Sequence, residues 1–272
     1  MKSYQFDVIG TRWVIEILSA EHFDDSLIAK IHGIIDEFDQ RYSRFRDDSL
    51  VAQLASEGEL CDPPQEFVDM LSFAREMYDV SEGAFSIAVG ASLHRMGYGS
   101  RVHGHSIRHD IWDNITFSKR RITAPKGEML DFGGFGKGWL IDRFVTLLRT
   151  SRVQEFIVNG GGDLYCQSDA QIEFRLEDPY DTMKQFGQTR ITRGALACSS
   201  TVKRTWRDGS LRKHHIIDPS TDDSSDSGVV ASYVRADTAL IADAMATILI
   251  IRPDLEATLK EKYQLQTILV KA

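Results

Sequence analysis

The stretch LDFGGFGKGW, residues 130–139, limits what this chain can fold into more than any other. It lies between an apolar, strand-like run and an amphipathic helix predicted from residue 138 onward. The apolar positions of that helix are Leu140, Ile141, Phe144, Val145, Leu147 and Leu148. Free backbone amides and the positive end of the helix dipole favour an anion at such a junction, so we expect a phosphorylated ligand there. The glycines are equally compatible with a tight turn that serves backbone geometry alone.

Two familiar phosphate loops are excluded by residue spacing. A P-loop needs a glycine five residues before its Gly-Lys pair and Ser or Thr after it, where this chain has Asp131 and Gly138. The dinucleotide fingerprint needs a third glycine where this chain has Trp139. The loop therefore belongs to neither class.

Composition describes a globular chain with few special features. A net charge of −8 argues against a nucleic-acid or anionic-membrane surface as the main role. The three cysteines form no CxxC pair, which favours a reducing compartment over a disulfide framework or zinc site. Charged residues interrupt the N-terminal apolar positions, so we expect a cytoplasmic protein without membrane insertion. The alternative that a leader peptide has been removed stays open.

The first third reads as a strand pair followed by two helices. Residues 4–9 and 12–18 are rich in β-branched and aromatic side chains around Gly10-Thr11. Apolar residues then repeat at helical spacing over 27–38, after N-cap candidates that include Asp24, and again over 67–78 after Pro63-Pro64. The intervening RYSRFRDDSL is expected to be a solvated loop whose aromatic side chains are suited to stacking on a planar ring.

A late apolar helix carries an unusual acid. It is expected between Asp237, as N-cap, and Pro253, and its apolar residues cover nearly the whole circumference, which predicts burial. An isolated carboxylate such as Asp243 is costly in a dry core unless it is paired or binds a metal. Thr247 lies one turn later, so a hard cation would satisfy both residues. An arginine or backbone amides would satisfy Asp243 equally well.

The histidines fall into two groups. His103, His105 and His109 lie in a glycine- and charge-rich segment that is read as a polar loop in preference to a metal site. His214 and His215 are adjacent, so in a strand they would point to opposite faces and would not share one metal. One of them is a candidate general base, and a surface hairpin is the alternative.

Seven short motifs occur in order along the chain: GTRW, SRFRDDS, SEGAF, LDFGGFGKG, VNGGGDL, HIIDP and ADAMAT. In that order they resemble the ApbE family, the magnesium-dependent FAD:protein FMN transferases, over essentially the whole chain. The resemblance implies an α+β fold in which residues 1–272 form a single ApbE-like domain. It further implies two intimately packed subdomains with the flavin site between them.

The resemblance also implies which residues form the site. Mg²⁺ would be held by the main chain of Gly134 and the side chains of Asp243 and Thr247. His215 is implied as the base, and Lys137 as a second catalytic group that also contacts FAD. The other implied FAD contacts are Ile9, Phe45, Ala84, Phe85, Ser86, Asp131 and Ile216.

The implied reaction moves FMN from FAD to a Ser or Thr hydroxyl of an acceptor flavoprotein, which carries a flavinylation motif, and releases AMP. Three residues depart from the family pattern: Ser86 replaces an acid, and Ser200 and Asp222 replace glycines. Two alternatives therefore remain. The chain would be an FAD-binding protein with weak or no transfer, or a Mg²⁺-dependent FAD diphosphatase that gives FMN and AMP.

Overall fold

The computed structural model describes residues 2–98, 111–208 and 211–272. The chain divides into two compact units, each built from segments that are distant in the sequence. Unit 1 consists of Met1–Glu37, Gly133–Lys203 and Gly228–Ala272, and unit 2 of Phe38–Phe132 and Arg204–Ser227. Both units combine helices and strands.

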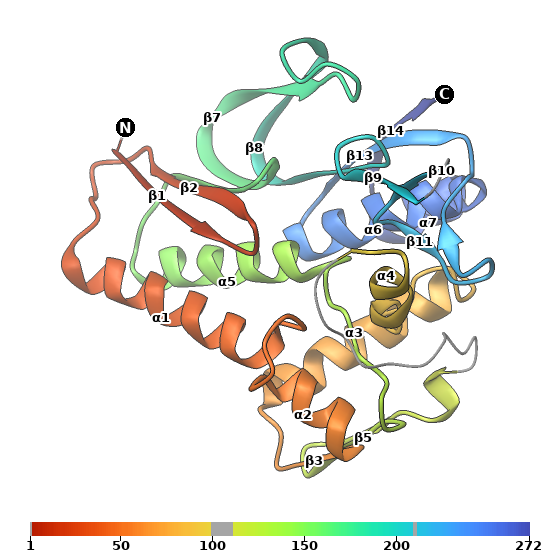
Figure 1. Cartoon of the computed structure of the whole chain (residues 1–272). Helices are drawn as coiled ribbons and strands as arrows, with labels where there is room; N and C mark the ends of the chain where they lie inside the picture. The colour runs from red at the N-terminus through yellow and green to blue at the C-terminus, as the bar shows by residue number, and fades with distance from the viewer. Residues whose placement is uncertain (1, 99–110, 209–210) are drawn as a thin grey trace. The chain divides into compact units, whose positions relative to one another are not determined.

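Unit 1 contains a seven-stranded sheet of order β1-β2-β6-β7-β8-β13-β14, in which all neighbouring strands are antiparallel (Figure 1). The strands are β1 (Lys2–Val8), β2 (Thr11–Ile17), β6 (Phe156–Gly160), β7 (Asp163–Glu177), β8 (Gln185–Ser200), β13 (Val229–Ala236) and β14 (Gln266–Lys271). The predicted N-terminal strand pair is confirmed as the β1–β2 hairpin. Its turn lies at Ile9-Gly10, one residue earlier than expected.

Helices α5 (Gly136–Thr150) and α6 (Ala239–Ile251) form the core of unit 1 with this sheet. Trp13, on the buried face of β2, meets Phe144 of α5 edge-on at 5.8 Å between ring centroids. The helix predicted after the glycine loop is therefore confirmed, and it begins at Gly136. The remaining helices are α1 (Asp25–Tyr42), which continues into unit 2, the short η2 (Pro253–Leu255) and α7 (Glu256–Tyr263).

The expected burial of α6 is confirmed, but its predicted N-cap is wrong. Thr238, not Asp237, precedes the first helical residue in an extended conformation. Its hydroxyl accepts a hydrogen bond from the backbone N–H of Ile241 at 3.3 Å. Thr238 is the cap because its side chain lies three residues before a free amide.

Unit 2 combines helices with three small antiparallel sheets, of orders β3-β5-β4, β9-β10 and β11-β12. Its helices are α2 (Leu50–Glu57), α3 (Gln65–Val80), α4 (Gly90–Arg95) and η1 (Ile111–Asp113). Its strands are β3 (Glu59–Cys61), β4 (Thr116–Phe117), β5 (Arg121–Thr123), β9 (Thr205–Asp208), β10 (Leu211–His214), β11 (Ile217–Asp218) and β12 (Asp223–Ser224). Helix α3 confirms the helix predicted after the proline pair.

The segment predicted as a solvated loop is only partly exposed. Tyr42 ends α1 and is buried, as are Arg44 and Ser49, whereas Phe45 is 60% exposed. Ser49 is the N-cap of α2, because its hydroxyl accepts from the amide of Ala52 at 3.1 Å. The sequence interpretation missed this short helix because it weighed the charges of the segment and not the capping serine.

Within the described residues, every helix is too short or too polar to cross a membrane. His103, His105 and His109 lie outside the described residues, so their interpretation as a polar loop stays a prediction.

The close approach of α5 and α6 gives a stability prediction. A Cβ added at Gly138 would lie 2.3 Å from the main-chain oxygen of Ala239, whereas one added at Gly33 in α1 would meet open space. We expect Gly138→Ala to lower the free energy of unfolding by about 2 kcal/mol through overpacking. The matched change Gly33→Ala should raise it by about 0.5–1 kcal/mol through helix propensity. Urea unfolding measures both, and an unchanged stability of Gly138→Ala would contradict the close approach.

Candidate active site

A cluster of buried charges lies at the start of α5 in unit 1. The Lys137 ammonium donates a hydrogen bond to Asp243 Oδ1 of α6 at 2.9 Å and another to Asp163 at the start of β7. The side chains of Asp163 and Asp243 are 5% and 3% exposed. Two buried carboxylates therefore share one ammonium, and the three side chains together carry one net negative charge.

The remaining carboxylate oxygens of the cluster bind main-chain amides. Asp243 Oδ2 accepts from the N–H of Gly138, and Asp163 Oδ1 accepts from the N–H of Cys198 in β8, both at 2.9 Å. The cluster thereby connects two helices with two strands of the sheet. One of the amides expected to be free for an anion at the start of α5, that of Gly138, is engaged by a carboxylate.

Burial and mutual attraction set the protonation of the cluster. Burial raises the pKa of Asp243 to about 6, with Lys137 acting against the shift and Asp163 reinforcing it. Burial alone would lower the pKa of Lys137, but the two carboxylates outweigh it and raise that pKa. The lysine therefore stays a cation at neutral pH.

The other two predicted metal ligands, Thr247 and Gly134, lie on α6 and in the turn before α5. Thr247, one turn further along α6, has its hydroxyl 3.0 Å from the hydroxyl of Ser199 in β8. Gly134 lies in the turn that leads into α5. In the part of the chain that the structure describes, no three acidic, histidine or cysteine side chains are placed to hold a metal together. A divalent ion bound by Asp243 would therefore need hydroxyl and main-chain oxygens as its other ligands. Such oxygens are donors that suit Mg²⁺.

A second buried ion pair lies in unit 2. Arg44 Nε is 2.6 Å from Asp131 Oδ2, with side chains 4% and 12% exposed. Arg44 also donates to the main-chain oxygen of Tyr98 at 3.3 Å, and its guanidinium lies 4.2 Å from the ring centroid of Phe45. Sequence reasoning selected Asp131 and Phe45 but missed Arg44. Its position directly before Phe45 was the available signal.

Tyr98 joins two further rings in unit 2. It stacks on Trp206 of β9 at 5.3 Å between centroids, and on His215 at 6.1 Å. Trp206 in turn donates its indole N–H to the main-chain oxygen of Met96 at 2.5 Å. Neither Tyr98 nor Trp206 was selected from the sequence, because single aromatic residues in polar segments carry no distinctive pattern.

The two adjacent histidines have different environments. His214 ends β10 and is buried. Its Nε2 lies 3.0 Å from the main-chain oxygen of Ser225, which only accepts, and its Nδ1 accepts from the N–H of Ile216 at 3.3 Å. These two bonds fix a neutral tautomer, so His214 is structural. His215 follows the strand and is half-buried, which leaves it as the candidate base.

The chain matches the ApbE family over residues 9–269. It belongs to the ApbE family. It is 24% identical over 267 residues to the FAD:protein FMN transferase of Klebsiella pneumoniae, covering 91% of this chain and 81% of that protein.

Solved ApbE structures share the fold. The flavin transferase ApbE of Vibrio cholerae has a TM-score of 0.83 at 20% identity, over 99% of this chain and 93% of that chain. The ApbE protein of Thermotoga maritima has a TM-score of 0.85 at 20% identity, over 99% and 94% of the two chains. The predicted α+β class is thereby confirmed.

The three residues expected to depart from the family pattern each have a place in the structure. Asp222 adopts a positive φ of 56°, a conformation that favours glycine, and both Ser92 and Arg95 bind its carboxylate. Ser86 Oγ accepts from the N–H of Ala88 at 3.1 Å. Ser200 is buried, with its hydroxyl accepting from the N–H of Val202 at 3.3 Å. Each of the three side chains therefore has a local partner.

The other residues proposed to contact FAD differ in exposure. Ala84, Phe85 and Ile216 are buried in unit 2. Ile9 is 38% exposed in the β1–β2 turn of unit 1, at a φ of 52°. Their roles as ligand contacts stay predictions.

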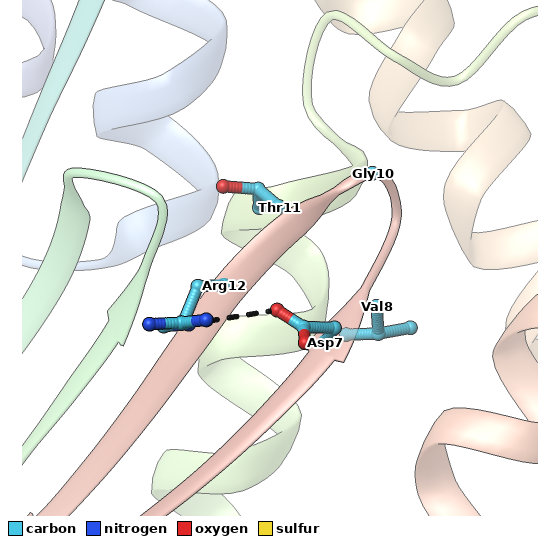
Figure 2. Close-up of a pocket in the computed structure, with 5 residues that line it drawn as sticks. All are labelled: Asp7, Val8, Gly10, Thr11 and Arg12. Atoms are coloured by element: carbon cyan, nitrogen blue, oxygen red, sulfur yellow. Dashed lines mark ion pairs between the residues drawn. The ribbon is translucent and has the colours of Figure 1, made fainter.

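The turn that contains Ile9 is strained. A β-branched residue at positive φ is an outlier that surrounding structure or function must maintain. The strand ends beside it line an open hollow, where Asp7 and Arg12 form an ion pair at 3.8 Å (Figure 2). Because strained residues cluster at functional sites, Ile9 keeps its predicted role as a ligand contact.

Relief of that strain is measurable. Asparagine tolerates positive φ and suits a two-residue hairpin turn, so we expect Ile9→Asn to raise the free energy of unfolding by about 1 kcal/mol. Ile9→Val keeps the β-branch and should leave stability unchanged. Chemical denaturation compares the two variants, and a destabilised Ile9→Asn would show that the turn is unstrained.

The buried His214 gives a pH prediction. Burial lowers its pKa below the ordinary 6.5, so the unfolded chain binds its proton more readily than the folded chain. The contribution of neutral His214 to the free energy of unfolding is therefore fully present above pH 6.5. It is lost as the pH falls from 6.5 toward the lower pKa of His214 in the folded protein. We expect His214→Gln to reduce this acid sensitivity in unfolding experiments between pH 5 and 8. The same change at exposed His22 serves as control, and an unaltered pH profile of His214→Gln would contradict the assignment.

Proposed function

We propose that this chain is a Mg²⁺-dependent FAD:protein FMN transferase. The contact between Lys137 and Asp243 carries the proposal, because it joins the LDFGGFGKG and ADAMAT motifs across 106 residues of sequence. Relatives named FAD:protein FMN transferase support the same activity. The substrates would be FAD and a protein with an acceptor hydroxyl.

The metal would be held by Asp243, Thr247 and the main-chain oxygen of Gly134. When bound, Mg²⁺ neutralises phosphate charge and acts as a Lewis acid on the diphosphate. The donor atoms of these residues are hard oxygens, and the net negative charge of the Lys137–Asp163–Asp243 cluster favours a cation.

Lys137 would act on the diphosphate itself. Its ammonium is held by buried carboxylates and stays protonated, so it presents a positive charge at a fixed place. Charge that develops on the phosphoryl oxygens in the transition state is stabilised by such a preorganised cation.

Residues of unit 2 would bind the flavin and accept the proton of the acceptor hydroxyl. Phe45 offers an exposed ring for stacking, and the paired Arg44 and Asp131 beside it give fixed polar contacts. His215 would take the proton from a Ser or Thr hydroxyl of the acceptor protein. That oxygen then bonds to the FMN phosphorus, the bond to the AMP phosphate breaks, and AMP leaves.

A direct assay tests the proposal. The purified protein is incubated with FAD and Mg²⁺, with and without an acceptor that carries a Thr-containing flavinylation motif, and AMP and intact mass are measured. We expect the acceptor to gain one FMN residue as AMP appears. AMP with free FMN and no labelled acceptor would indicate a diphosphatase. Bound FAD without AMP would indicate a binding protein.

A variant pair tests the metal assignment. Asp243→Asn removes the proposed ligand charge with little change of volume and should lower Mg²⁺-dependent turnover at least about a hundredfold. Asp254→Asn, on the exposed η2 turn, is the control and should retain turnover. Circular dichroism confirms that both variants are folded. Full turnover of Asp243→Asn would remove this residue from the site.

A further inference from the structure

Asp163, one of the most buried carboxylates in unit 1, contacts Lys137 but is not among the residues proposed to hold the metal or to act on FAD. It begins β7 directly after Gly161 and Gly162, whose φ angles are 70° and 106°, respectively. This glycine turn brings the chain back along β6 and places the carboxylate against Lys137. The ammonium and the N–H of Cys198 compensate this carboxylate in the core.

Asp163 is the second counter-ion of Lys137. The ammonium contacts Asp163 and Asp243 at the same time, and the side chain of Lys137 is 21% exposed. A divalent ion that binds Asp243 repels the ammonium and competes with it for the same carboxylate. Lys137 then needs another fixed negative charge close by. Asp163 is the contact of Lys137 that supplies this charge.

Asp163 also connects to the hydroxyl beside the proposed metal site. It accepts from the N–H of Cys198, and the next residue, Ser199, has its hydroxyl 3.0 Å from that of Thr247. The same carboxylate therefore fixes both Lys137 and the segment of β8 that faces Thr247.

We propose that Asp163 is a positioning residue that retains the Lys137 ammonium beside the ion site when a divalent cation takes over Asp243. This inference rests on the proposed metal site and adds a residue that holds no ion itself. Without the Asp163 charge, Asp243 becomes the sole carboxylate partner that the structure gives Lys137, and the lysine competes with the ion. Asp163 thereby raises the affinity for the cation indirectly.

Cation binding without FAD tests this role. Mn²⁺ is titrated into the purified protein and bound ion is measured by electron paramagnetic resonance. Asp163→Asn keeps an oxygen that accepts from Cys198 but removes the charge, so we expect the Mn²⁺ dissociation constant to rise at least about tenfold. Lys137→Met removes the competing ammonium and should bind Mn²⁺ at least as tightly as the wild type.

The double variant separates charge balance from structural damage. Asp163→Asn with Lys137→Met has the same net cluster charge as the wild type, so its Mn²⁺ affinity should return to the wild-type value or above. Wild-type affinity in Asp163→Asn would overturn the proposal, as would a double variant as weak as Asp163→Asn. Thermal unfolding of each variant verifies that it is folded.

The result is independent of catalysis. A wild type that binds no Mn²⁺ would overturn the positioning role, whatever the transfer assay shows. The predicted order of Mn²⁺ affinities in a protein that transfers no FMN would support the positioning role and contradict the proposed function alone.

Discussion

The ammonium of Lys137, held between Asp163 and Asp243, is the interaction on which the rest of unit 1 depends. Each buried carboxylate would be costly alone, and each is satisfied by the same lysine and by one main-chain amide. Because these partners come from α5, α6, β7 and β8, the cluster fixes two helices against the centre of the sheet. The glycine at position 138 permits this arrangement, since any side chain there would collide with α6.

Unit 2 also contains a buried ion pair, between Arg44 and Asp131. Arg44 is buried because Asp131 neutralises it and Tyr98 accepts a further hydrogen bond. The guanidinium then supports the ring of Phe45, which remains exposed. Asp131 and Lys137 belong to one short motif, yet they complete the buried ion pairs of separate units. The LDFGGFGKG stretch therefore contributes to the electrostatics of both.

The helices with a repeating apolar pattern were predictable from the sequence. Helical periodicity gave α1, α3, α5 and the buried α6, and the rarity of a carboxylate in an apolar helix identified Asp243. Features that depend on distant partners were not predictable. Asp163 and Arg44 were missed because their significance lies in the charge that each meets, and no local spacing indicates that charge. The cap of α6 was placed one residue too early because Asp237 and Thr238 are both good caps.

We propose that a divalent ion meets the diphosphate of FAD at the Lys137–Asp163–Asp243 cluster. The most direct measurement is phosphorus NMR of FAD bound to excess protein without acceptor, with a small amount of Mn²⁺. We expect strong broadening of both phosphorus signals in the wild type and much weaker broadening in Asp243→Asn. Equal broadening in the two proteins would contradict this proposal.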